Sequence, residues 1–312
     1  MTRFAFVLFY FIVFGPSSVA AESAYQEHHF QSAGADIHLV WYSSFTDAQQ
    51  AKLTTWVKSG LTLVRHLNGA LPRKKMRFHL QQQDSKGKSP VPYAQVLRDG
   101  MPGVHFWVDA NRSDYDLKRD WTFTHELVHL FIDYPGDKDL WISEGLATYY
   151  QNILLVRGGL LTERDFWRRF IEGLRRGRHD SNYDGYPLEA VSEHMRGIGS
   201  YMRVYWSGAL FFLQGSIALL ERDQPHLDEL LRTFIDCCQK EQALMRGQDL
   251  LKTFDKLAKG NWFQQQYEVY RYIDRMPNFD ATLQSLGVEL RGQYLYLDPS
   301  NSIRRKIVYG YD

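Results

Sequence analysis

The sequence contains little cysteine, no excess of either charge, and no long apolar run after its N-terminus. Only two of its 312 residues are cysteine, which excludes a scaffold stabilised by several disulfides. The 37 basic residues are balanced by 36 acidic ones, so there is no strong positive field and nucleic acid is not expected as a partner. No later apolar run reaches about 18 residues, so no stable membrane span is expected after signal cleavage. What is present, 44% hydrophobic residues, is enough for a sizeable core.

The N-terminus has the pattern of a secretory signal. Arg3 precedes the apolar run FAFVLFYFIVF (4–14), and the small residues SSVAA (17–21) follow a Gly-Pro pair. This order predicts a signal peptide over residues 1–21, with cleavage near Ala20 or Ala21, and therefore a secreted or periplasmic protein. An uncleaved membrane anchor is the alternative.

Two other local patterns allow both a structural and a functional interpretation. Cys237 and Cys238 are adjacent in an amphipathic helical pattern, and bridging neighbours requires unusual geometry. We interpret them as small buried hydrophobic residues, with a redox or metal role as the alternative. The basic run RRFIEGLRRGR (168–178) is interpreted as the solvated face of a helix, and contact with an anionic surface or substrate is the alternative.

The mature chain changes character near residue 115. Before it, short runs rich in β-branched and aromatic residues predict strands at 35–44, 75–83 and 103–110, with a helix at 47–67. After it, apolar periodicity predicts helices near 120–134, 142–156, 163–177, 205–222, 226–240, 247–258 and 261–274. We therefore predict an α+β fold: a β-containing N-terminal lobe at 22–115, a mainly helical lobe at 116–288 and a C-terminal segment at 289–312.

The stretch THELVHLFIDYPGDKDLWISEGLATYY (124–150) carries the strongest functional pattern. His125 and His129 are four residues apart, so both project from one helix face, where a single Zn²⁺ can bind both imidazoles. The Pro-Gly pair ends this helix, and Glu144 in the next one can face back as a third ligand. Glu126 lies where it can reach a metal-activated water as general base. Two histidines, one carboxylate and an open position are typical of a catalytic site with one Zn²⁺ per chain.

The segments HELVH and LWISEGLATYY resemble the gluzincin metallopeptidases, most closely the glycyl aminopeptidase family and its aminopeptidase N relatives. The resemblance implies a thermolysin-like catalytic lobe with His125, His129 and Glu144 as zinc ligands and Glu126 as general base. The segment YWSGALFFL (205–213) is similar to the family segment whose tyrosine stabilises the oxyanion, and that position is Tyr205 here.

Four further residues lie near these motifs. Thr148 and Tyr149 lie about one turn beyond Glu144, and either is placed to orient a metal ligand. His105 is interpreted as an ordinary strand histidine, with a place in the substrate groove as the alternative. Trp141 is interpreted as a packing residue.

The chain also departs from these families in ways that affect specificity. There is no room for the PDZ domain of glycyl aminopeptidases, and most of their N-terminal β domain is missing. Aminopeptidase N relatives bind the substrate amine with the glutamate of a Gly-x-Met-Glu-Asn segment, and the nearest stretch here, DGMPGVHF (99–106), has no acid at that place. Asp99 and Asp109 flank the predicted strand and are the remaining candidates, so exopeptidase and endopeptidase activity both stay open.

Together these patterns predict a secreted zinc-dependent peptidase that acts on peptide or protein substrates. Two alternatives are a non-catalytic zinc-containing envelope or binding protein, and a hydrolase of a non-peptide amide. The intact Glu126 argues against the first, because a binding protein needs no proton acceptor there. The sequence gives no indication of the oligomeric state.

Overall fold

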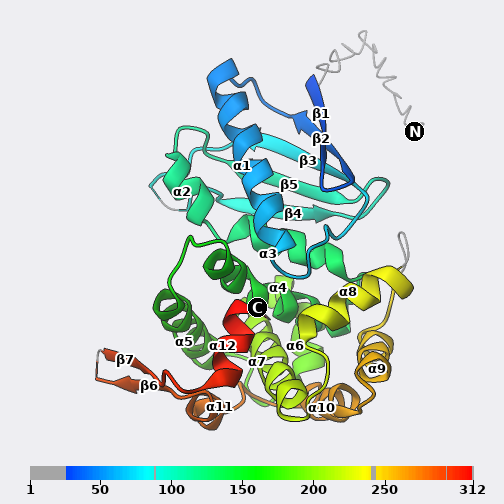
Figure 1. Cartoon of the computed structure of the whole chain (residues 1–312), viewed down its shortest axis with the longest axis vertical. Coiled ribbons are helices and arrows are strands. Elements are labelled where there is room, and N and C mark those ends of the chain that lie inside the picture. The colour runs from blue at the N-terminus through cyan, green and yellow to red at the C-terminus, as the bar shows by residue number, and fades with distance from the viewer. Residues whose placement is uncertain (1–25, 88, 240–243, 293, 311–312) are drawn as a thin grey trace, which may run out of the picture.

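The structure, a computed structural model, describes residues 26–87, 89–239, 244–292 and 294–310. The predicted signal peptide at 1–21 lies outside the described residues. The chain forms one lobe built on a sheet and a second lobe of helices, which confirms the predicted α+β fold class (Figure 1). The domain boundaries at 115 and 288 stay predictions. No helix in the described ranges is both long enough and apolar enough to cross a membrane.

The N-terminal lobe is built on five strands in the order β1-β2-β3-β5-β4. The central strands β2 (Ala35–Trp41), β3 (Lys75–Gln82) and β5 (Gly103–Val108) are parallel and confirm the three predicted strands. The edge strands β1 (Gln26–Ser32) and β4 (Tyr93–Leu97) are antiparallel and were not predicted. An edge strand is exposed, and the sequence of β1, QEHHFQS, has only one apolar residue to signal it.

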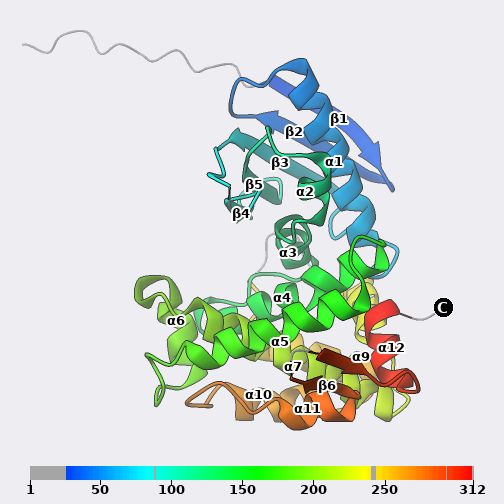
Figure 2. The ribbon, with the colours of Figure 1, turned by 90° about the vertical axis from the view of Figure 1, so that its left-hand side faces the viewer.

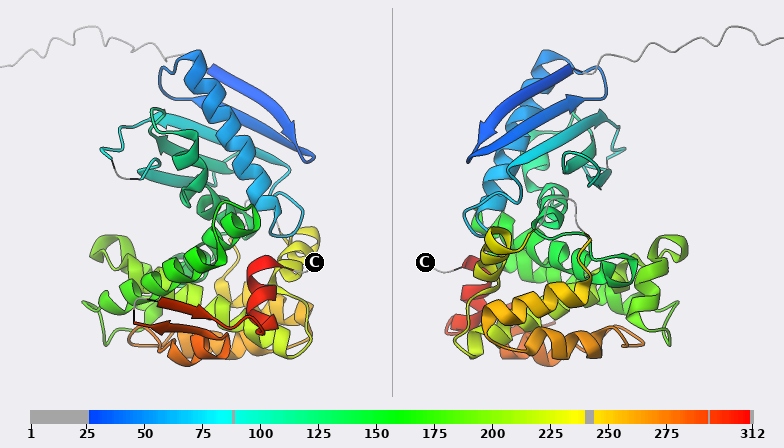
Figure 3. Two further views of the ribbon diagram at one scale, coloured as in Figure 1. Left: turned by 60° about the vertical axis from the view of Figure 1, so that its left-hand side comes forward. Right: turned by 90° about the vertical axis from the view of Figure 1, so that its right-hand side faces the viewer.

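One face of this sheet is covered by α1 (Asp47–Arg65), as the views in Figure 3 show. The helix begins with a capping box in which Thr46 and Gln49 satisfy each other's backbone N–H groups. Its buried residues include Leu53, Val57 and Leu61, spaced by four, so a single apolar stripe packs on the sheet.

Helix α3 (Thr122–Val128) lies between the sheet and the helical lobe, below α1 and after the short α2 (Asp114–Arg119) (Figure 2). The Phe123 ring packs against those of Trp56, Phe106 and Phe78, with centroids 5.1, 5.2 and 5.8 Å apart. The segment that contains the HELVH motif is therefore fixed to the core of the sheet lobe rather than carried on a surface loop.

The helical lobe is organised around α4 (Leu140–Arg157) and α7 (Tyr201–Glu221), which pack against each other. Every residue of α4 from Leu140 to Val156 is buried. In this lobe, helices α6, α11 and α12 add to the seven helical segments that the sequence predicted. The surrounding elements are α5 (Glu163–His179), α6 (Leu188–Ile198), α8 (Leu227–Cys237), α9 (Gly247–Ala258), α10 (Trp262–Tyr270), α11 (Asp280–Ser285), β6 (Val288–Arg291), β7 (Tyr294–Leu297) and α12 (Ser302–Tyr309).

The crossing of α4 and α7 is unusually close because both helices have glycine at the contact. A Cβ atom at Gly208 would lie 2.0 Å from the Trp141 carbonyl oxygen, and one at Gly145 would lie 2.4 Å from the Gly208 backbone. Glu144 precedes one glycine directly, and Tyr205 lies one turn before the other. The close approach therefore brings both functional candidates to the same region.

Two predictions about local structure are wrong. The helix predicted at 120–134 is shorter, because α3 ends at Val128 and His129–Phe131 (η1) form a 3₁₀ turn before Ile132 becomes extended. Tightening of the last turn in this way is common at helix ends. Cys237 and Cys238 are not unbonded buried residues, since a disulfide joins them. The helix ends at Cys237, which leaves that side chain exposed and outside the core expected from the amphipathic pattern.

Candidate metal centre

Three side chains from three helical segments converge at the junction of the lobes. His125 comes from α3, His129 from the turn η1 and Glu144 from α4, and all three are buried. Their potential ligand atoms all lie within 4.8 Å of one another. The sequence predicted this set, and the structure brings it together.

The distances within this set suit a tetrahedral metal ion. Oε2 of Glu144 lies 3.3 Å from Nε2 of His125 and 3.5 Å from Nε2 of His129. Ligands about 2.0–2.1 Å from a tetrahedral zinc are separated by roughly 3.3–3.4 Å. Two neutral nitrogens and one carboxylate oxygen are also the donor types that zinc prefers, so the residues present fit this ion.

Each histidine is held by a hydrogen bond at its other ring nitrogen. Nδ1 of His125 lies 2.9 Å from Oε1 of Gln151, and Nδ1 of His129 lies 2.9 Å from Oγ of Ser143. When Nδ1 donates in these bonds, both Nε2 atoms carry free lone pairs aimed at Glu144. Both partners lie on α4, the helix that carries Glu144.

This finding differs from the roles expected for Thr148 and Tyr149. The Tyr149 hydroxyl bonds with Ser216, 2.9 Å away, and the Thr148 hydroxyl has no hydrogen-bond partner among the described residues. Gln151 was not among the residues considered. It lies seven residues after Glu144, on the same helix face two turns further on, and this spacing is the signal that could have found it.

The turn that carries His129 is held by side chains from distant segments. Arg98 donates to the carbonyl oxygens of His129 and Ile132, at 3.2 and 3.3 Å. Arg73 donates to Leu130, and Gln239 donates to both Leu130 and Phe131. Carbonyl groups at a helix end lack partners within the helix, so these donors fix the end of α3 and with it the position of His129.

Glu126 lies beside the metal ligands without being one of them. The residue is half-buried, and no hydrogen bond joins its carboxylate to another residue in the described ranges. Burial is the largest influence and raises the pKa of the Glu126 carboxyl, against the opposing charges of His125 and His129. For Glu144 burial acts in the same direction, but the two histidines outweigh it and lower the pKa. Glu126 therefore has the higher pKa of the two carboxyl groups and Glu144 the lower, as expected for a general base beside a metal-binding carboxylate.

Tyr205 closes the same site from α7. Its ring packs against that of His125, with centroids 5.8 Å apart and planes at 25°. Burial, together with the charges of Glu144 and Glu126, raises the pKa of the Tyr205 phenol well above its usual value. The phenol therefore stays protonated at neutral pH and is available as a hydrogen-bond donor.

A pocket of about 510 Å³ opens beside these groups. It is lined by residues of α2, α4, α5 and α7, among them Thr148, Gln151 and Tyr205. Gln151 also holds His125, and Tyr205 packs on the same ring, so the pocket adjoins the candidate metal centre.

Other residues singled out in the sequence have structural contacts. The Asp109 carboxylate accepts hydrogen bonds from Ser85 and from the backbone of Asn111 within its own loop. His105 bonds with Gln81 and stacks on Trp107, as expected of a strand histidine. Trp141 is fully buried against aromatic rings of α7 and α10, in agreement with its assignment as a packing residue. The Asp99 carbonyl, on the turn after β4, accepts a hydrogen bond from Arg77.

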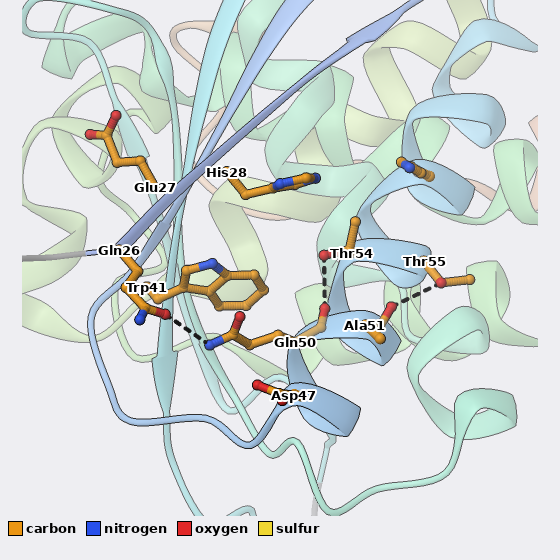
Figure 4. Close-up of a pocket in the computed structure, with 10 residues that line it drawn as sticks. Gln26, Glu27, His28, Trp41, Asp47, Gln50, Ala51, Thr54 and Thr55 are labelled. Carbon is orange, nitrogen blue, oxygen red and sulfur yellow. Dashed lines mark hydrogen bonds between the residues drawn. The ribbon is translucent and has the colours of Figure 1, made fainter.

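A second group of potential ligands lies on the sheet. Glu27, His29 and His38 from β1 and β2 meet the same 4.8 Å limit, but Glu27 and His29 are exposed. Alternate residues of a strand face opposite sides, so His28 points instead toward α1, where a hollow of about 690 Å³ lies between β1 and α1 (Figure 4). In the same view Glu27 points away from α1. This sheet cluster provides a control site in the same protein for testing whether a metal ion binds at the buried centre.

Comparison with known proteins supports the resemblance drawn from the motifs. Residues 131–209, which include Glu144 and Tyr205, match the family model described as M61 glycyl aminopeptidase. The structure of an aminopeptidase N family protein from Idiomarina loihiensis aligns with a TM-score of 0.59 and 15% sequence identity. The alignment covers 86% of this chain and 50% of that protein. The structure of an M1 zinc metallopeptidase from Deinococcus radiodurans aligns with a TM-score of 0.49 and 14% sequence identity. That alignment covers 81% of this chain and 53% of the other protein. No curated protein matches the chain significantly.

The fold is therefore similar to that of the aminopeptidase N family protein. Over residues 131–209 the chain also resembles the glycyl aminopeptidases, and the predicted resemblance to gluzincins is confirmed. The chain spans about half the length of these solved structures.

Proposed function

We propose that the protein is a zinc-dependent peptidase that hydrolyses peptide bonds in peptide or protein substrates, with Glu126 as general base. The observation that carries the proposal is the convergence of His125, His129 and Glu144 at zinc-ligand distances, beside the Glu126 carboxylate, which forms no hydrogen bond with any described residue. The match to a peptidase family over residues 131–209 supports the choice of reaction. An inert zinc protein would not need the Glu126 carboxylate at this position.

His125, His129 and Glu144 would hold the ion, which when bound would supply a Lewis acid for the scissile carbonyl and lower the pKa of the attacking water. Glu126 accepts a proton from that water and returns it to the leaving amine. The protonated Tyr205 phenol donates a hydrogen bond to the oxyanion that develops on the substrate carbonyl, the position where a fixed donor contributes most.

We also infer that the protein acts outside the cytoplasm. The support is the N-terminal sequence alone, in which Arg3, the apolar run at 4–14 and the small residues at 17–21 follow the order of a signal peptide. Expression of the full chain followed by N-terminal sequencing of the exported protein tests this, and a mature N-terminus after Ala20 or Ala21 is expected.

The test of catalysis compares the mature protein with Glu126→Gln. The substitution keeps the shape of the side chain and removes the proton acceptor, so zinc content should remain while peptide hydrolysis falls by about 100-fold or more. Hydrolysis at an unchanged rate would place the chemistry elsewhere.

The test of the metal site measures zinc after dialysis. The protein should retain close to one zinc per chain, His129→Ala should lose it, and His38→Ala should keep it. His38 belongs to the sheet cluster. Loss of zinc in His38→Ala but not in His129→Ala would therefore show that the ion binds at the sheet cluster, and would contradict the proposed site.

A further inference from the structure

The pocket beside Tyr205 is lined by four arginines, and most of them lack an acidic partner. Two, Arg169 and Arg176, belong to the basic run on α5, and Arg119 comes from α2. Arg119 donates to the Leu160 carbonyl, and Arg169 donates to the Asn152 side chain at 3.1 Å. The Arg176 guanidinium lies over the Trp206 ring, 5.6 Å from its centroid. Among the described residues, none of these three cations forms an ion pair.

The acidic side chains that line the pocket offset only part of the positive charge of these arginines. Asp116 pairs with the fourth arginine, Arg112, at 3.2 Å. Asp120 is buried and accepts hydrogen bonds from Ser89 and Thr122. Burial raises the pKa of the Asp120 carboxyl, although those hydrogen bonds and the nearby charge of Arg169 oppose the shift. Among the described residues Glu172 forms no ion pair, and its side chain is exposed.

Thr148 adds an independent sign that a ligand binds here. This residue lines the pocket, is 2% exposed, and its hydroxyl has no hydrogen-bond partner within the described part of the chain. Leaving a buried hydroxyl unpaired is costly, so a bound group that supplies an acceptor or donor would be favoured there. A carboxylate oxygen accepts from a hydroxyl as readily as from a guanidinium.

We propose that this pocket is a substrate subsite that binds a carboxylate of the peptide, through Arg169, Arg176 and Thr148. The inference rests on the proposed peptidase function and adds a substrate class to it. Guanidinium groups present planar N–H donors that match a carboxylate, and such charge-assisted bonds are among the strongest in proteins. The pocket adjoins Tyr205 and Gln151, so the bound carboxylate belongs to a residue close to the bond that is cut.

Two sources supply this chemistry, an Asp or Glu side chain and the free C-terminus of a short peptide. Four matched fluorogenic peptides separate them: a glutamate peptide and its glutamine counterpart, each with a free or an amidated C-terminus. A preference for glutamate over glutamine in the amidated pair assigns the side chain. A preference for the free over the amidated glutamine peptide assigns the C-terminus.

The variants Arg169→Gln and Arg176→Gln test the residues. The ratio of kcat/KM for the carboxylate peptide to that for its neutral counterpart should be at least about tenfold in the unmutated protein and should fall toward one in each variant. Arg175→Gln is the matched control, because Arg175 is an exposed neighbour on α5 that does not line the pocket. Should Arg169→Gln not fold, Arg176→Gln carries the test, since the Arg176 side chain is exposed.

Equilibrium binding provides a second readout that needs no turnover. In a Glu126→Gln background, the carboxylate peptide should bind at least about tenfold more tightly than the neutral one, and Arg176→Gln should remove the difference. Hydrolysis of neutral and acidic peptides at equal rates, or a preference for lysine peptides, would overturn the inference while leaving the peptidase proposal intact. Absence of any hydrolysis would contradict the peptidase proposal, and the binding experiment would still decide the subsite.

Discussion

Nδ1 of His125 and Oε1 of Gln151 lie 2.9 Å apart, and the bond joins the first predicted zinc ligand to a residue two turns beyond Glu144 on α4. An amide oxygen can only accept, so the bond places the proton of the neutral imidazole on Nδ1 and leaves Nε2 for a metal. Gln151 is therefore a positioning residue for the candidate metal centre.

Replacing Gln151 with Ala should weaken zinc binding by about 10- to 100-fold, as found for partners that orient metal ligands. Competition with a calibrated chelator measures the change directly. Tyr149→Phe is the control, because it removes a buried hydroxyl from the same helix, one bonded to Ser216 rather than to a ligand. Equal zinc affinity in Gln151→Ala and the unmutated protein would show that the bond is dispensable.

Substitution of Gly208 tests the crossing of α4 and α7. Gly208→Ala places a Cβ atom 2.0 Å from the Trp141 carbonyl oxygen, so the helices must move apart. We expect the free energy of unfolding to fall by about 1–3 kcal/mol, the usual range for overpacking, in urea denaturation. Gly197→Ala on α6 is the control, since its Cβ would meet open space. Activity should fall in Gly208→Ala alone, because Tyr205 and Glu144 depend on that crossing.

Stability should depend on pH through His79 of β3. Burial, then the charges of Arg77 and His105, lower the His79 pKa to about 4, and Glu27 opposes this shift. Between about pH 6.5 and pH 4 the unfolded chain binds a proton at this residue that the folded chain does not. Stability is therefore lost as the pH falls through that window.

The comparison of His79→Gln with the unmutated protein isolates this effect. Between pH 6.5 and pH 4 the free energy of unfolding should fall by about 1–2 kcal/mol less in the variant than in the unmutated protein. This value is smaller than the full pKa shift would give, because solvent screens the charge. His179→Gln, at the exposed end of α5, should follow the unmutated protein. Identical curves for all three proteins would show that His79 makes no such contribution.

The fourth prediction concerns the N-terminus of the substrate. Asp109 is engaged by Ser85 and Asn111, and no acid occupies the place in DGMPGVHF where aminopeptidase N relatives have glutamate. A charge-assisted contact to a free amine is therefore not expected from these residues. N-acetylated peptides should be cleaved within about tenfold of free ones, a difference of roughly 1.4 kcal/mol. Strict dependence on a free amine would redirect attention to Asp99.

The metal ligands could be predicted because their relationships are local. His125, His129 and Glu144 lie within 20 consecutive residues, and helical periodicity places the two histidines on one face. The residues that hold these ligands gave weaker signals or none. Arg98 and Arg73 are 31 and 57 residues from the backbone groups they bind, and Gln239 is 109 residues away.

The elements that were missed share a physical cause. Strand β1 pairs along one edge only, so its sequence is mostly polar and has no alternating apolar pattern. The central strands β2, β3 and β5 are buried on at least one face and carry the apolar residues that identified them. Gln151 was not among the candidates, which were Thr148 and Tyr149, because whether a residue of α4 reaches His125 depends on how α4 packs against α3.

Metal affinity depends on segments far from the ligands, because these segments hold the turn at 129–132 in place. Its carbonyl groups are bound by Arg73 before β3, Arg98 after β4 and Gln239 after α8. An isolated peptide spanning 124–150 would contain every ligand and yet lack the donors that hold His129 in place. Zinc therefore binds the folded state in preference to the unfolded one, and ligand linkage adds about 2.7 kcal/mol of stability at a free zinc concentration of 100 times Kd. In an environment where zinc is scarce, the same linkage would leave the metal-free chain less stable and more open to proteolysis.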